Sequence, residues 1–142
     1  MDILTLGKIV KDRQVPLLLS LTRNFVTPMY RASFLASAAS SGVLACLAVR
    51  PCDLDTLAAR VGAKGDPRLL RAWLDLGVRL GDLGWDDGCY RLRSRTAKAL
   101  ARTRNDAVTA ALEEVVRFHL PLVAGAPGML RDGRRLSLKD QD

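Results

Sequence analysis

Apolar residues in the N-terminal part of the chain recur at helical spacing. The positions of Ile3, Leu6 and Ile9 predict an amphipathic helix that ends before Pro16, because the residue before a proline disfavours helical backbone. A second apolar stretch follows, and Pro28 is expected to open the next helix at its first turn. Since this arm is hydrophobic on more than one face, we expect it to pack against the rest of the domain or a second subunit.

Three further helices are expected in the central part of the chain. Residues 30–48 show helical spacing of apolar side chains, and Gly42 allows a bend within them. Residues 53–62 begin with an aspartate that can act as N-cap and end with a glycine. Residues 66–80 begin with Asp-Pro, a typical helix start. The side chains of this third helix expected to face inward are Leu69, Leu70, Trp73, Leu74 and Leu76.

The pattern then changes from helical spacing to alternation. Asp87-Gly88 lies between Trp85 and the alternating Tyr90 and Leu92, and such a dipeptide favours a hairpin because the turn needs positive φ angles. The order is therefore helix, helix, turn, helix and β-hairpin. We predict a mainly α fold, a winged helix with extra helices at both ends.

Beyond the hairpin the sequence predicts more helix. Residues 96–101 fit a short helix, and Asn105 starts a longer one that Pro121 bends or ends. The expected organisation is a helical arm at 1–30, a winged-helix domain at 31–130, and a polar tail or linker to a catalytic domain at 131–142.

Composition narrows the class of protein. With 142 residues, 49% of them hydrophobic, the chain is long enough to bury a core without disulfides or a structural metal. Its longest apolar runs are far shorter than the ~20 residues of a membrane helix. Charged residues near the N-terminus interrupt any signal-peptide core. We therefore expect a cytoplasmic protein that does not enter a membrane.

Residues for catalysis on this chain alone are scarce. The three cysteines, Cys46, Cys52 and Cys89, lack CxxC spacing, so a zinc site or disulfide framework is not expected, and the first two fit small buried hydrophobes. His119 is the single histidine, and we interpret it as packed or interfacial. Glu113 and Glu114 are neighbours on a helix and do not face one site. No phosphate-binding glycine loop follows a strand, so we expect no catalytic, cofactor or metal site.

The net charge of +7 raises nucleic-acid binding as an alternative. Helix 66–80 stands where a winged helix keeps its recognition helix, and its exposed stripe is expected to hold Arg68, Arg71, Asp75 and Arg79. Asp75 would repel phosphate there. The favoured interpretation is therefore a solvent-exposed face on which Asp75 forms ion pairs with Arg71 and Arg79. The best candidate phosphate-binding patch has no acidic residue among its cations: Arg91, Arg93, Arg95, Lys98, Arg102 and Arg104.

Six stretches of the chain share a pattern with a known family, and they are residues 24–31, 41–44, 53–62, 74–78, 87–92 and 105–107. Together they resemble the N-terminal winged-helix domain of bacterial S-adenosylmethionine-dependent methyltransferases of the O-methyltransferase type. The resemblance extends from about residue 24 to 130, and its motifs are moderately specific because regulators share the winged helix.

The resemblance implies a domain that dimerises and helps to wall the substrate pocket. In that family a following Rossmann-like domain binds S-adenosylmethionine, and this sequence ends where the linker to it would begin. The resemblance thus implies a fragment, a truncated gene product or a free-standing domain, with no cofactor residue on this chain.

We therefore expect a homodimer that is inactive alone, with a separate or missing catalytic domain as its partner. Two alternatives remain: a DNA-binding winged-helix regulator, and an interaction module for a separate catalytic subunit. The residues hypothesised for a two-fold interface lie in the arm and the helix after it: Ile3, Leu6, Ile9, Leu17, Leu21, Phe25, Tyr30 and Phe34.

Overall fold

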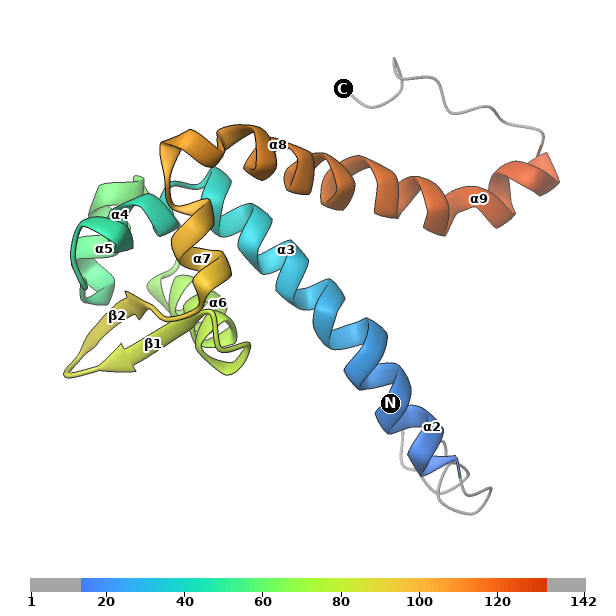
Figure 1. Ribbon diagram of the computed structural model, residues 1–142, viewed down its shortest axis with the longest axis horizontal. Helices are drawn as coiled ribbons and strands as arrows, with labels where there is room; N and C mark the ends of the chain where they lie inside the picture. Colours follow the sequence, from blue (N-terminus) through green and yellow to red (C-terminus); the bar gives the residue numbers. More distant parts are fainter. Residues whose placement is uncertain (1–13, 133–142) are drawn as a thin grey trace. The chain divides into compact units, whose positions relative to one another are not determined.

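The computed structural model describes residues 14–132 (Figure 1). The chain divides into two compact units between Arg31 and Ala32. The first is a helical arm, and the second carries the winged helix and the C-terminal helices.

The arm is helical throughout its described length. α2 (Val15–Leu21) leads into a π-helical segment, η1 (Thr22–Val26), and then into α3 (Thr27–Ser40). None of the residues from 14 to 30 is buried. The helix predicted around Ile3 to Ile9 lies outside the described residues.

Pro28 lies in the first turn of α3 as predicted, but the helical run does not break before it. A proline lacks an N–H group, and its ring clashes with the carbonyl four residues earlier in a regular α-helix. Here the wider π-turn precedes the proline, and the N–H of Thr27 donates to the carbonyl of Thr22, five residues back. The wider turn lets the helix continue through the proline.

The second unit contains the predicted winged helix, which confirms the fold class (Figure 1). After the end of α3, its elements are α4 (Val43–Val49), α5 (Leu54–Val61), α6 (Pro67–Arg79), β1 (Leu83–Asp86), β2 (Cys89–Leu92) and α7 (Arg95–Leu100).

Local chemistry explains where these helices begin and end. The carboxylates of Asp53 and Asp66 accept backbone N–H bonds at the starts of α5 and α6, at 2.7 and 2.8 Å. Gly62 ends α5 in the left-handed conformation. The single helix expected over residues 30–48 is instead two helices, because Gly42 adopts a φ of +79° between α3 and α4. A left-handed residue breaks the helix, whereas the sequence predicted only a bend at this glycine.

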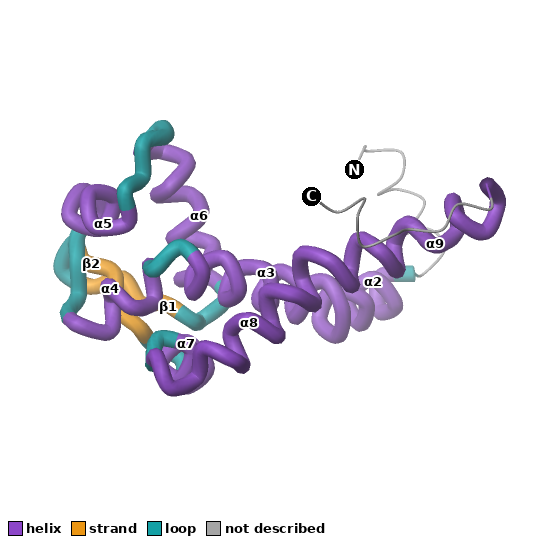
Figure 2. Tube along the Cα trace, turned by 90° about the horizontal axis from the view of Figure 1, so that it is seen from above, coloured by secondary structure: helices purple, strands orange, loops and turns teal. Residues whose placement is uncertain are grey.

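The hairpin forms as predicted. Asp87 and Gly88 both have positive φ, and Trp85 lies directly opposite Tyr90 in the antiparallel register. Cys52 adds a bridge to the hairpin by exchanging two backbone hydrogen bonds with Tyr90, at 2.8 and 3.1 Å. Figure 2 shows the two strands beside α4, which contacts β2.

The core of the second unit is formed by side chains from α3, α4, α5, α6, α7 and the hairpin. Its largest fully buried side chains are Phe34, Leu44, Leu57, Leu74, Leu83 and Tyr90. Gly77 of α6 is buried against Phe34, and a β-carbon at this glycine would overlap the phenylalanine ring. The same ring contacts Trp73 in a tilted arrangement, at a centroid distance of 5.1 Å and an interplanar angle of 46°. Gly77 is therefore a packing residue inside α6 rather than part of the helix end.

Leu69 does not face inward as predicted. Its side chain is 71% exposed, whereas Leu74 is fully buried and Leu70 is half-buried. The buried stripe of α6 is centred on Leu70, Leu74 and Gly77, so Leu69 lies at its edge in the first turn.

One buried polar cluster ties the turn after α6 to α7. Asp82 is fully buried, and the hydroxyl of Ser94 donates to its Oδ1 at 2.5 Å. The same hydroxyl oxygen accepts the N–H of Ala97 at 3.0 Å and so caps α7. The N–H groups of Arg93 and Ser94 donate to the carbonyl of Asp82. These bonds hold the strand-to-helix connection in place.

The C-terminal helix, like the arm, has a π-helical segment just before a proline. Its elements are η2 (Thr103–Asn105), α8 (Asp106–Glu114), the π-helical η3 (Val115–His119) and α9 (Leu120–Asp132). The N–H of Leu120 donates to the carbonyl of Val115, immediately before Pro121. The proline therefore does not end the helix, which continues to Asp132 and includes the first residues of the expected tail.

Candidate functional site

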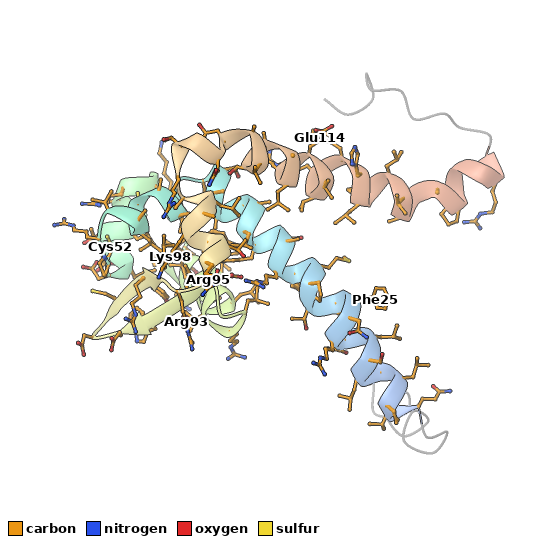
Figure 3. All side chains as sticks on the ribbon, viewed as in Figure 1. Phe25, Cys52, Arg93, Arg95, Lys98 and Glu114 are labelled. Carbon is orange, nitrogen blue, oxygen red and sulfur yellow. The ribbon has the colours of Figure 1, made fainter. Side chains whose placement is uncertain are left out.

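The most distinctive surface of the described chain is the apolar arm. Large hydrophobic side chains stay exposed along its whole length, and they lie on more than one side of the helix. They are Val15, Leu17, Leu18, Leu19, Leu21, Phe25, Val26, Met29 and Tyr30. We call these residues the apolar arm surface. Phe25, labelled in Figure 3, is 65% exposed.

Two polar side chains of the arm donate hydrogen bonds within their own helix. The hydroxyl of Thr22 donates to the carbonyl of Leu18 at 2.8 Å, one turn earlier. The amide of Asn24 donates to the hydroxyl of Ser20 at 3.1 Å. These bonds run within the helix, so the arm offers a partner mainly apolar contact area.

The structure separates the residues hypothesised for the interface into three groups. Leu17, Leu21, Phe25 and Tyr30 belong to the apolar arm surface. Phe34 is 2% exposed and lies in the core against Trp73, so it is unavailable to an interface. Helical spacing alone does not distinguish these two environments, because both faces are apolar. The remaining residues, Ile3, Leu6 and Ile9, lie outside the described residues.

A second exposed apolar stripe runs along the C-terminal helix, and it was not among the predictions from the sequence. Val108, Val115 and Leu122 recur every seven residues, with Phe118 between the last two, and all four are exposed. Spacings of seven, three and four residues are typical of helices that pack against another helix. The sequence predicts that Pro121 bends or ends this helix, so a stripe that continues past the proline was not expected.

The exposed face of α6 differs from the predicted network of ion pairs. Asp75 accepts a hydrogen bond from the hydroxyl of Tyr90 on β2, at 3.0 Å. Within the described part of the chain, Asp75 has no ion pair with Arg71 or Arg79 within 4.0 Å. Arg68 lies 3.9 Å from the N-cap residue Asp66. The expected Arg71–Asp75 and Asp75–Arg79 pairs are therefore wrong.

Burial of Tyr90 raises the pKa of its phenol above the ordinary value of 10.0. The hydrogen bond to Asp75 and the negative charge of that carboxylate raise the pKa further. The hydrogen bond and positive charge of Arg71 act in the opposite direction. Tyr90 thus remains a neutral hydrogen-bond donor, and its donated bond fixes the carboxylate of Asp75.

The candidate phosphate-binding patch lies on β2, the turn after it, and α7. Arg91 approaches Asp86 on the opposite strand, with Nη2 and Oδ2 3.5 Å apart. Arg93, Arg95 and Lys98 are exposed and make no ion pair with any other described residue (Figure 3). Arg102 is exposed too. These four residues form a solvated cationic patch.

The residues considered for catalysis do not converge. Oε1 of Glu113 pairs with Arg117 at 2.9 Å, and Oε1 of Glu114 lies 3.8 Å from Nε2 of His119. His119 is exposed on η3, so it is not packed in the core of the single chain, and the interfacial alternative stays a prediction. Among residues 14–132, no group of three or more His, Cys, Asp and Glu side chains is arranged to hold a metal ion.

Cys52 is buried at the bridge to the hairpin, as predicted (Figure 3), while Cys46 and Cys89 are partly buried. In the described ranges no single helix has both the length and the apolar character needed to cross a membrane; one bent pair, residues 15–40 with 43–49, meets these criteria by length and composition only.

No protein-family model matches this sequence, and no curated protein matches it. We therefore infer function from the surfaces described above and from the sequence resemblance.

Proposed function

We propose that this chain is the dimerisation and substrate-pocket domain of an S-adenosylmethionine-dependent methyltransferase. The chain forms a homodimer through its apolar arm surface, and it is inactive alone. S-adenosylmethionine binds a separate catalytic domain, to which this chain contributes no cofactor residue.

The exposure of the apolar arm surface is the observation that supports dimerisation most directly. Isolated exposed leucines are common on proteins, but nine exposed large apolar side chains within residues 15–30 are not. Burying such side chains contributes roughly 25 cal/mol for each Å² removed from water. A second copy of the same helix supplies a matching apolar face, as two-fold symmetric interfaces require.

The sequence resemblance supports the enzyme class. It rests on stretches within both units, including residues 24–31 in the arm and 87–92 at the hairpin. A winged helix alone does not specify an activity. The methyltransferase part of the proposal therefore depends on these motifs, whereas the dimerisation part depends on the exposed arm.

Light scattering coupled to size-exclusion chromatography tests the dimer. At micromolar concentration we expect the mass of two 15.5 kDa chains. Leu21→Glu and Phe25→Glu each place a charge in the apolar arm surface, and we expect both variants to elute at the mass of one chain. The matched control is Leu69→Glu, which places the same charge on an exposed leucine of α6 and should leave the dimer intact.

A monomeric wild-type chain at these concentrations would refute dimerisation through the arm. Equal dissociation by Leu69→Glu would also refute it, because the effect would then come from added charge rather than from the arm. Circular dichroism of each variant shows whether its helices remain folded.

An antibody against this domain tests the enzyme class by measuring the mass of the native gene product in its source cells. A mass well above 15.5 kDa is expected if a catalytic domain belongs to the same polypeptide. A native product at this mass would contradict that arrangement and would favour a free-standing module.

A DNA-binding regulator is the second candidate, favoured by the solvated cations Arg93, Arg95 and Lys98. If it is correct, duplex DNA binds with an affinity that falls steeply between 50 and 200 mM salt, by roughly tenfold or more for several phosphate contacts. Arg93→Gln with Arg95→Gln should then weaken binding to every sequence. Asp75 argues against major-groove contact, because its carboxylate lies among the arginines of α6.

A further inference from the structure

A groove of about 450 Å³ lies between α6 and the hairpin. Its lining residues are Arg71, Asp75, Val78, Arg79, Trp85 and Tyr90. All of them belong to the second unit, so the groove does not depend on the placement of the arm. Its volume falls within the range of small-molecule sites, roughly 300–1,000 Å³.

We propose that this groove binds a small planar anion, an aromatic ring that carries a carboxylate or a similar acidic group. The proposal is independent of the dimerisation and methyltransferase roles. It follows from three features of the lining, which are the charges, the aromatic surface and the fixed carboxylate.

The charges of the groove select an anion. Two guanidinium groups and one carboxylate line it, so its side chains carry an excess of one positive charge. Neither Arg71 nor Arg79 forms an ion pair with another described residue. Guanidinium groups bind carboxylates through paired, charge-assisted hydrogen bonds. A cationic ligand would meet two like charges and only one opposite charge.

The aromatic surface selects a planar ring. Trp85 keeps 43% of its surface exposed, although its ring contacts Tyr90 at a centroid distance of 4.5 Å in an edge-on arrangement. The two residues lie directly opposite each other in the hairpin, and both line the groove together with residues of α6. A flat ligand ring stacks favourably on such a surface, and Val78 adds an apolar contact.

The carboxylate of Asp75 limits what the groove accepts. Tyr90 is 1% exposed, and its hydroxyl donates to Oδ1 of Asp75 at 3.0 Å. The hydrogen bond occupies one acceptor position of the carboxylate, and among the described residues Asp75 forms no ion pair with Arg71 or Arg79 within 4.0 Å. The negative charge nevertheless remains in the groove, so it weakens anion binding and disfavours a polyphosphate backbone. Removing that charge should strengthen binding of the proposed ligand.

Nuclear magnetic resonance of the ¹⁵N-labelled full chain tests the site. The chain has two tryptophans, Trp73 and Trp85, and therefore two indole N–H signals. The probe is 2-naphthoate, with 2-naphthalenemethanol as the same ring without charge and acetate as the charge without the ring. We expect 2-naphthoate to move the Trp85 signal in a saturable way. The alcohol should bind about tenfold more weakly, and acetate should leave the signal unchanged.

Three variants separate specific binding from general attraction. Arg79→Gln should weaken 2-naphthoate binding about fivefold to tenfold, whereas Asp75→Asn should tighten it severalfold, because the amide oxygen still accepts the tyrosine hydrogen bond without the negative charge. Arg68→Gln removes one positive charge from the same helix outside the groove, so binding should stay within about twofold.

Equal affinity for the alcohol and the acid would overturn the proposal, because the groove would then select only apolar surface. A similar loss of affinity in Arg79→Gln and Arg68→Gln would also overturn it, since net charge rather than the groove would control binding. So would unchanged or weaker binding in Asp75→Asn. Spectra of the ligand-free variants establish that each remains folded.

Discussion

Two phenylalanines in the helical run from Val15 to Ser40 have opposite surroundings. Phe25 is 65% exposed in the arm, whereas Phe34 is 2% exposed in the winged-helix unit. Both belong to apolar stretches with helical spacing, so their sequence contexts are alike. The difference is that Phe34 has a complementary site on α6. Its ring packs against Gly77, which has no side chain, and beside Trp73. Periodicity marks a face that can be buried, but the partner that buries it determines whether the face is core or interface.

The largest expected effect is the contrast between truncating these two rings. Phe34→Ala should lower the free energy of unfolding by about 3–5 kcal/mol, the range for removing a buried aromatic side chain. Phe25→Ala should change it by at most about 0.5 kcal/mol, because the ring already contacts water in the single chain. Urea denaturation followed by circular dichroism measures both values.

Both substitutions belong in the Leu21→Glu background, so that dissociation of a dimer does not contribute to the apparent stability. A loss from Phe25→Ala as large as that from Phe34→Ala would show that the arm surface is buried within one chain. That result would remove the contrast between the two units.

Adding a methyl group at Gly77 should produce the next largest effect. Gly77→Ala forces the ring of Phe34 to move, and overpacking of this kind costs about 1–3 kcal/mol even though alanine favours helix. Phe34→Leu in the same chain should recover part of the loss, because the two side chains compete for one space. Thermal or urea unfolding of the single and double variants measures this coupling.

Gly65→Ala is the matched control, since a β-carbon at Gly65 would have no heavy atom within 4 Å. It should leave the stability unchanged or raise it slightly. If Gly77→Ala behaved in the same way, the Phe34–Gly77 contact would not explain why this part of the helical run is buried.

The helix starts and the hairpin turn could be predicted from the sequence, because each depends on residues that are close together in the chain. The caps at Asp53 and Asp66 and the turn at Asp87-Gly88 depend on residues a few positions apart, and the structure has all three. The two prolines were harder to interpret. A proline usually ends or kinks a helix, and nothing in the sequence indicated that a π-turn before Pro28 or Pro121 would let the helix continue.

The surfaces were less predictable than the elements. Arg71 and Arg79 were natural partners for Asp75 because they lie one helical turn away, yet its hydrogen-bond donor is Tyr90, fifteen residues further along the chain. A contact between elements depends on how the hairpin packs against α6, which spacing within α6 does not reveal. The groove beside Asp75 was missed for the same reason.

A partly buried hydroxyl group in the second unit and an exposed one in the arm extend the comparison between the two units. Ser94→Ala removes both the cap of α7 and the donor to the buried Asp82, so it should cost about 1–3 kcal/mol of stability. Thr22→Ala in the arm removes a hydrogen bond that water can replace, and it should change stability by less than about 0.5 kcal/mol. Urea unfolding in the Leu21→Glu background compares them. Equal losses would indicate that the arm's local hydrogen bonds stabilise the chain as strongly as the buried cluster.

The smallest expected effect concerns alkaline pH. Burial, with the hydrogen bond and charge of Asp75, raises the pKa of Tyr90 in the folded chain above its ordinary value of 10.0. The unfolded chain therefore loses this proton first, so the stabilisation is complete below pH 10 and is lost as pH rises through the folded pKa.

Urea unfolding between pH 8 and 11 should show a fall in stability that is steeper in the wild-type chain than in Tyr90→Phe. The comparison uses the slope against pH, because the missing hydroxyl also changes the stability at neutral pH. Identical slopes in the wild type and Tyr90→Phe would mean that burial against α6 does not hold the phenol in its neutral form.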